Sequence, residues 1–137
     1  LGLSGAITPQ WQVSAGYALQ DAKIRKSTSA APAGREVPLV PKQQASLWTR
    51  YDFTPSFGAA VGVYHQSTSF TSVSNTAVLP AFTRVDAAAF FELTPNIEAQ
   101  INVENLLDSN YFSSAYNDNN IMPGAPTTAR ATIKMRY

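Results

Sequence analysis

The chain has 137 residues, and its 10 basic and 9 acidic side chains leave a formal net charge of +1. Charged residues make up 14% of the chain and hydrophobic residues 45%, whereas roughly 25% of an average soluble domain is charged. This balance gives no sign of a nucleic-acid-binding surface, and the absence of cysteine excludes disulfides and thiolate metal sites. No apolar run approaches the roughly 18 residues of a membrane-spanning helix.

The first residues, Leu1 to Gly5, contain neither the basic segment nor the cleavage site of a signal peptide. The strand pattern is already under way there, so we interpret the chain as a fragment whose missing part carries any export signal. Because only helices and closed barrels satisfy their backbone groups in lipid, a charge-poor chain without long apolar runs favours a β-barrel.

Seven long strands are expected in chain order. They cover residues 1–7, 11–23, 42–53, 57–67, 83–93, 97–107 and 128–137. Three short turns repeat one pattern, a large apolar residue followed by Thr-Pro and a polar residue, at 7–10, 53–56 and 93–96. Proline sets φ for a tight turn and does not fit a central strand. Three long polar connections alternate with these turns, as extracellular loops alternate with periplasmic turns in outer-membrane barrels. They cover 25–41, 66–82 and 108–127.

Side chains in these strands alternate with a period of two. Large apolar residues such as Leu47, Val61 and Ile101 stand at odd positions. Ten charged residues of the strands after position 43 all stand at even positions: Arg50, Asp52, Arg84, Asp86, Glu92, Glu98, Glu104, Arg130, Lys134 and Arg136. A charge on the lipid face costs roughly 2–4 kcal/mol at mid-bilayer. The pattern therefore predicts an odd face toward lipid and an even face toward a polar lumen.

Large apolar residues also gather beside the short turns and the C-terminus. They are Ile7, Trp11, Phe53, Phe57, Phe91, Leu93, Ile97 and Tyr137. Aromatic rings at a membrane interface form such a girdle, which we expect on the periplasmic side. The alternative is a set of strand-end aromatics that cover a soluble core, although soluble strands average only five or six residues. The fold class predicted is an all-β, antiparallel up-and-down meander of about seven long strands.

Four segments carry a resemblance to a known family. They are Val40 to Thr49, Leu79 to Asp86, Asn102 to Phe112 and Asn119 to Pro126. In this order they resemble the C-terminal portion of TonB-dependent outer-membrane receptors, most closely the ferric catecholate siderophore receptors. The chain departs from the family where Thr127 and Thr128 precede Arg130, where Leu107 replaces Phe, and where Tyr137 replaces a terminal Phe.

The resemblance implies a 22-stranded transmembrane barrel in the bacterial outer membrane, filled by an N-terminal plug domain. Residues 1–137 would then be one partial barrel, with the plug and the earlier strands absent. Its function would be import of a ferric siderophore, with the catecholate type favoured. Implied partners are TonB through the plug, the barrel-assembly machinery through the C-terminal strand, and outer-membrane lipid. The cargo brings its own iron, so no protein-bound cofactor is expected.

Two groups of residues are candidates for specific roles. A structural motif at the exit of a strand is predicted from Asn105, Leu106, Asp108 and Tyr111, together with Tyr137 at the barrel's end. Exposed amides and aromatic rings of the loops are the candidate ligand contacts, although polar turn composition explains them as well. These candidates are Gln66, Phe70, Tyr116, Asn117, Asn119 and Asn120.

Enzymatic and metal-binding roles find no support in the sequence. His65 is the single histidine and has no companion ligands at suitable spacing. The carboxylates Glu92 and Glu98 can pair, but no nucleophile–base pair accompanies them, and mixed charges are expected in a barrel lumen. We predict no catalytic residue and no enzyme. Two other classes of protein remain as alternatives: a passive porin-like barrel, and a soluble β-sandwich or lipocalin-like binding module.

Overall fold

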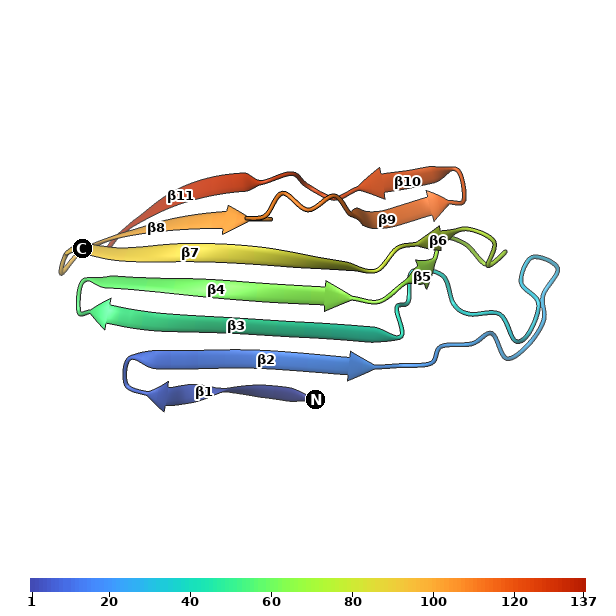
Figure 1. Ribbon diagram of the computed structural model, residues 1–137, viewed down its shortest axis with the longest axis horizontal. Coiled ribbons are helices and arrows are strands. Elements are labelled where there is room, and N and C mark those ends of the chain that lie inside the picture. Colours follow the sequence, from blue (N-terminus) through green and yellow to red (C-terminus); the bar gives the residue numbers. More distant parts are fainter.

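The computed structural model describes residues 1–137 and consists of strands, turns and loops. Seven long strands form one antiparallel sheet in the order β1-β2-β3-β4-β7-β8-β11, which confirms the predicted meander (Figure 1). Their bounds are Gly2–Thr8 (β1), Trp11–Leu19 (β2), Gln43–Thr54 (β3), Phe57–Gln66 (β4), Phe82–Thr94 (β7), Ile97–Glu104 (β8) and Thr128–Met135 (β11). No helix of the structure has the length and apolar character needed to span a membrane.

Four short strands lie inside the long connections, where the sequence predicted only loops. β5 (Ser69–Phe70) pairs with β6 (Val78–Leu79), and β9 (Phe112–Asn117) pairs with β10 (Asn120–Pro123). All long connections lie at one end of the sheet and all short turns at the other (Figure 1). We call residues 20–42 the first loop, 67–81 the middle loop and 105–127 the last loop.

Four predicted strands end earlier than expected. β2 ends at Leu19 instead of residue 23, β4 at Gln66 instead of 67, β8 at Glu104 instead of 107, and β11 at Met135 instead of 137. The β2–β3 register, in which Leu19 pairs with Gln43, would bring Lys23 opposite Leu39, but Lys23 forms an isolated bridge with Glu36. Pro38 and Pro41, between Glu36 and Gln43, supply no N–H to a ladder, so regular pairing stops at Leu19.

The three short turns have one geometry. Thr8 pairs with Trp11, Thr54 with Phe57, and Thr94 with Ile97. In each case the register shifts at the residue just before the threonine. In two of the turns, the threonine Oγ1 accepts a hydrogen bond from the N–H of the residue after proline, at 3.3 Å and 3.4 Å. The bulge leaves the apolar residue before threonine unpaired. The repeated Thr-Pro pattern thus encodes a repeated bulged turn.

The cross-strand register confirms the predicted division of faces. Outside the three bulged turns, odd residues pair with odd residues throughout the seven-stranded sheet, as Val61 does with Ala87 and Ala89 with Ile101. The sheet is a single layer, and only 10 of 137 residues are buried. Leu47, Val61 and Ile101 are each about 45% exposed. A sandwich would cover these side chains with a second sheet, so the odd face of this layer is suited to lipid.

The predicted aromatic girdle forms a continuous row at the short-turn end. Ring centroids lie 5.1 Å apart between Tyr51 and Phe53, 5.5 Å between Phe53 and Phe57, and 5.3 Å between Phe57 and Phe91. Trp11 donates its indole N–H to Thr49 Oγ1 at 2.7 Å. Rings in contact across three strands give this end of the odd face the amphipathic rim expected at a membrane interface.

The even face carries large aromatic side chains that alternation alone did not predict, and two of them lie near the middle of the sheet. Trp48 lies over Gly62, where a Cβ atom would approach the indole Cε3 to 2.4 Å. Phe90 lies under the guanidinium of Arg50, 4.1 Å from the ring centroid. The small residues of β4 therefore make room for large side chains of its neighbours, and the lumen face is polar with apolar exceptions.

Candidate ligand-binding loops

Asn105 holds the point at which the chain leaves β8. It adopts a left-handed φ of +51° and is 1% exposed. Its side-chain amide donates to the carbonyls of Ser109 and Ala125, both at 3.0 Å, and its Oδ1 accepts from Ser109 N–H at 2.9 Å. Its own N–H donates to Asp86 Oδ1 at 2.8 Å. Asparagine tolerates this backbone region and supplies all of these bonds, which suits it to the position.

Asp108 and Thr127 tie the two ends of the last loop together. Asp108, also left-handed with φ of +48°, accepts from Thr127 N–H at 3.2 Å and lies 3.3 Å from its hydroxyl. The Thr127 hydroxyl donates to Asn105 O at 2.7 Å. Thr127 is one of the residues by which this chain departs from the family pattern, and it closes the base of the loop. Leu106 donates its backbone N–H to Val85 O, while its side chain is 45% exposed.

Tyr111 is enclosed on both sides of its ring. One side stacks on Phe82, with centroids 4.4 Å apart, and Arg84 donates to the phenol oxygen at 3.4 Å. On the other side, a Cβ added to Gly124 would lie 2.2–2.4 Å from the ring carbons. The tight approach requires glycine at position 124. The contact between Tyr111 and Gly124 joins the start of the last loop to its end, beside Phe82 at the beginning of β7.

The predicted ligand contacts lie on two neighbouring structures at the long-loop end. Tyr116 on β9 is 84% exposed. Asn117 ends β9, Asn119 lies in the two-residue turn with Asp118, and Asn120 begins β10. Asn117 Oδ1 accepts the N–H of Asn119 at 2.9 Å. The structure thus brings four of the six candidates together on the β9–β10 hairpin.

The other two candidates belong to β4 and the middle loop. Gln66 ends β4, and its Oε1 accepts from the Tyr64 hydroxyl at 3.0 Å. Phe70 in β5 is half-buried, and its carbonyl accepts the N–H of Leu39 at 2.8 Å. Tyr137 follows the last strand at the short-turn end of the sheet. The N–H of its neighbour Arg136 donates a hydrogen bond to Asn96 O at 2.9 Å. The roles assigned to these residues stay predictions.

Asp118 at the tip of the last loop makes contacts that sequence reasoning missed. Its carboxylate accepts hydrogen bonds from hydroxyls of the middle loop: Thr71, Ser74 at 2.7 Å and Thr76 at 2.9 Å. These hydroxyls, with Thr71 contributing most, hold the pKa of Asp118 well below its usual range. The run of serines and threonines at 71–76 is the signal in the sequence, but a polar loop is expected to have that composition in any case.

Positive charge at this end is concentrated in the first loop. Five of the ten basic side chains lie in residues 20–42, against two carboxylates, and neither other loop contains a cation. Asp21 pairs with Lys23 at 2.9 Å, and the Glu36 carboxylate raises the pKa of Lys42 through a hydrogen bond and its charge. Arg25 and Lys26 are exposed and form no ion pair with this chain. These charges lie outside the long strands, so side-chain alternation does not reveal them.

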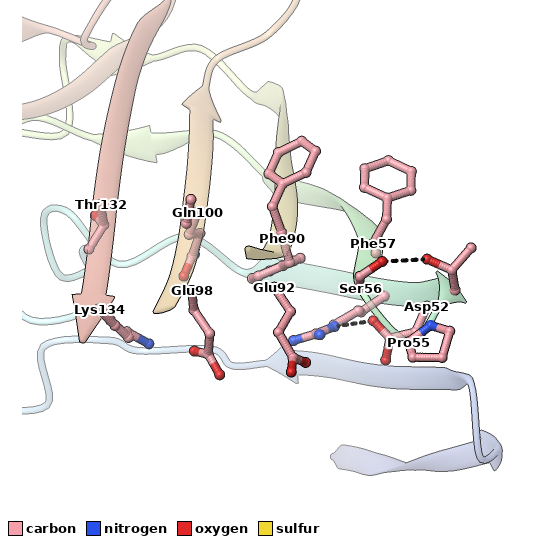
Figure 2. Close-up of a pocket in the computed structure, with 15 residues that line it drawn as sticks. Asp52, Pro55, Ser56, Phe57, Phe90, Glu92, Glu98, Gln100, Thr132 and Lys134 are labelled. Atoms are coloured by element: carbon pink, nitrogen blue, oxygen red, sulfur yellow. Dashed lines mark hydrogen bonds and ion pairs between the residues drawn. The ribbon is translucent and has the colours of Figure 1, made fainter. Parts of the chain in front are cut away.

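A pocket of about 270 Å³ lies at the opposite end of the lumen face (Figure 2). Arg50 forms an ion pair with Asp52 at 2.9 Å, and Glu92 lies opposite Glu98 in the register. Figure 2 shows Glu92 and Glu98 on neighbouring strands with Lys134 beside them. Glu98 pairs with Arg136 at 2.8 Å. The charges at this site neutralise one another in part, as expected for a lumen wall.

His65 lies on the odd face near the long-loop end, where its Nδ1 is 2.8 Å from Thr83 Oγ1. No group of three or more histidine, cysteine, aspartate or glutamate side chains in the structure has the geometry to hold a metal ion.

Comparison with known proteins identifies the family. Residues 1–106 match the family described as "TonB dependent receptor-like, beta-barrel". The chain belongs to this family. It is therefore a segment of a bacterial outer-membrane β-barrel, as the resemblance implied, and the family consists of receptors and transporters.

Individual relatives cover the whole chain. The chain is 31% identical to the probable TonB-dependent siderophore receptor PiuA of Acinetobacter baumannii, 29% to the catecholate siderophore receptor Fiu of Escherichia coli K12, and 32% to the metal-pseudopaline receptor CntO of Pseudomonas aeruginosa. Each alignment covers 100% of this chain and 19–20% of the relative. The chain thus spans about a fifth of the length of these relatives.

Solved structures agree with this assignment. The crystal structure of PiuA superposes on 99% of this chain with a TM-score of 0.88 at 31% identity, which covers 21% of that receptor. The closed form of Fiu superposes on 99% of the chain with a TM-score of 0.85 at 26% identity, which covers 20% of that receptor. The similarity includes the last loop as well as the seven membrane-spanning strands.

Proposed function

We propose that this chain forms part of the wall and three outer loops of a transporter that imports a ferric siderophore across the outer membrane, with catecholate complexes favoured. The observation that carries the proposal is the match over the whole chain to the siderophore receptors PiuA and Fiu, in sequence and in fold. Family membership favours this function over a passive porin, and the single-layer sheet favours it over a soluble sandwich.

The charge distribution supports an anionic cargo. A ferric ion bound by three catecholates carries net negative charge, and the first loop carries an excess of cations at the entrance. Clustered charge raises the local concentration of an oppositely charged ligand and its rate of association. Exposed Tyr116 and the neighbouring amides of Asn117, Asn119 and Asn120 are the proposed hydrogen-bonding contacts, with Gln66 and Phe70 at the edge of the site. Because the siderophore supplies every iron ligand, the protein needs no cofactor of its own.

Other partners follow from the same proposal. Upstream residues would supply the remaining strands and a plug domain through which TonB acts. β11, with its alternating pattern and Tyr137 after it, would present a strand to the barrel-assembly machinery by strand addition. The odd face of the sheet would contact outer-membrane lipid. As part of a barrel wall, the chain requires no catalytic residue.

The test uses the full-length receptor in detergent and in cells. Binding is measured for ferric tris(2,3-dihydroxybenzoate), for a ferric hydroxamate and for the iron-free catecholate, and uptake of radioactive iron is compared with and without TonB. Selective binding of the ferric catecholate and TonB-dependent uptake are expected. Preference for the hydroxamate would refute the catecholate assignment, and uptake that persists without TonB would refute active transport.

A further inference from the structure

The middle loop forms a joint with the last loop. It has no charged residue but contains seven serines and threonines within residues 67–81. Three of their hydroxyls, from Thr71, Ser74 and Thr76, converge on the Asp118 carboxylate of the last loop. Thr71 is 2% exposed, so its hydroxyl has left water for this contact. Hydrogen bonds to an ionised acceptor are shorter and stronger than neutral ones, which makes this a firm connection.

A second joint connects the middle loop to the first loop. Arg35 donates to the carbonyls of Val73 at 2.9 Å and Ser74 at 2.7 Å. The Asn75 side chain pairs with the backbone of Glu36 in both directions, accepting from its N–H at 2.8 Å and donating to its carbonyl at 3.0 Å. Asn75 has a left-handed φ of +54°, so the loop is bent to present this amide. Ser74 thus takes part in both joints.

We infer that the three outer loops move as one body, and that Asp118 is a positioning residue that sets the place of the β9–β10 hairpin within it. Asp118 lies between Asn117 and Asn119, two of the proposed cargo contacts, and two residues from Tyr116. A bond that holds the Asp118 carboxylate therefore limits where these side chains point. The joints themselves do not depend on the proposed function, but the consequence for cargo binding does.

The first test examines the joint without cargo. Asp118→Ala in the full-length receptor is expected to accelerate amide hydrogen exchange in both residues 69–79 and residues 112–123, because both sides lose the bond. Asn119→Ala is the matched control, since the Asn119 side chain makes no hydrogen bond to the middle loop. Unchanged exchange in Asp118→Ala would overturn the inference, whatever the receptor transports.

The second test replaces the joint by a covalent link. This chain has no cysteine, so Thr76→Cys with Asp118→Cys introduces a thiol pair that a short thiol-reactive linker can bridge; cysteines elsewhere in the full-length receptor are first replaced. The unlinked double variant is expected to bind ferric catecholate about tenfold more weakly, equivalent to about 1.4 kcal/mol, with an unchanged maximal uptake rate. Linking is expected to restore affinity and to leave uptake intact.

The outcomes of the second test are distinguishable. If the linked receptor binds cargo but no longer transports it, the joint must open during transport and the loops do not move as one body. If the unlinked variant already binds like the unmodified receptor, Asp118 does not position the contacts. Failure of the unmodified receptor to bind any ferric catecholate would refute the proposed cargo and leave the hydrogen-exchange result standing.

Discussion

The two ends of the sheet are built in different ways. At the short-turn end, three turns repeat one sequence pattern and one bulged geometry, and aromatic side chains of adjacent strands stack in a row. At the long-loop end, each loop has its own sequence, and side chains bond to the backbone or to other side chains across loops. Local rules therefore shape the first end, whereas contacts between distant segments shape the second.

The largest effect on assembly is expected from charged substitutions on the odd face, the lipid-facing side that runs between both ends of the sheet. Val61→Arg with Ile101→Arg places two charges on the odd face, each at a cost of roughly 2–4 kcal/mol near mid-bilayer. We expect loss of the folded receptor from outer-membrane fractions, measured by its heat-modifiable mobility on gels. Gln100→Arg, beside Ile101 on the even face, is the control and should assemble normally. Equal loss in the control would contradict the assignment of faces.

The next largest effect is expected at Asn105, where the long-loop end depends most on one side chain. Asn105→Ala removes the three side-chain hydrogen bonds to Ser109 and Ala125 in a buried site and leaves a left-handed φ on alanine, at a cost of about 2–4 kcal/mol. Asn105→Gly relieves the backbone strain but not the lost bonds, so it should recover part of that stability. Denaturant unfolding of the purified receptor measures both. Full recovery by glycine would show that the side-chain bonds contribute nothing.

A smaller effect is expected at Gly124, where a Cβ would collide with the Tyr111 ring. Gly124→Ala should displace Tyr111 from Phe82 and lower stability by about 1–3 kcal/mol, as overpacking usually does. Tyr111→Ala in the same chain removes the clash, so the two changes should be strongly non-additive. The comparison of single and double variants by thermal unfolding checks this. Simple additivity would mean that the ring and the glycine are not in contact.

The smallest effect is expected from pH. Hydrogen bonds that lower the pKa of Asp118 stabilise the folded loops above the ordinary aspartate pKa of about 3.9, and this contribution is lost as pH falls through the lowered value. Hydrogen exchange of the middle loop, corrected for its intrinsic pH dependence, should therefore stay constant from about pH 8 to pH 5. Loss of protection within that window would show that Asp118 is not held as an ionised acceptor.

Much of the fold could be predicted because barrel strands obey a period of two. A charge that faces lipid is costly, so the positions of Arg50, Glu92 and the other strand charges indicate the lumen face from the sequence alone. The Thr-Pro repeats located the short turns for a similarly local reason, since proline restricts φ and lacks an N–H. The same alternation missed Trp48 and Phe90, because it does not reveal which small residues, such as Gly62, lie beneath a large neighbour.

The loops could be predicted only in outline. Their polar composition indicated exposed connections, but it did not reveal the β5–β6 and β9–β10 hairpins or the early end of β2. The bonds of Asp118 join residues 42 to 47 positions apart. Asn105 and Tyr111 were predicted to form a structural motif, but their contacts with Ala125, Phe82 and Gly124 were not predicted. A short polar side chain can bond to any nearby donor or acceptor, so its partner is set by proximity in space.

By itself, the sequence determined the strands, the two faces, the turns and the family, because each follows from local backbone rules or from side-chain alternation imposed by lipid and lumen. Only the tertiary structure decided which loops are joined and which cations of the first loop form ion pairs. It also decided which contacts hold Asn105, Tyr111 and Asp118. Those features arise from hydrogen bonds and ring contacts between segments that the chain brings together only when the sheet has formed.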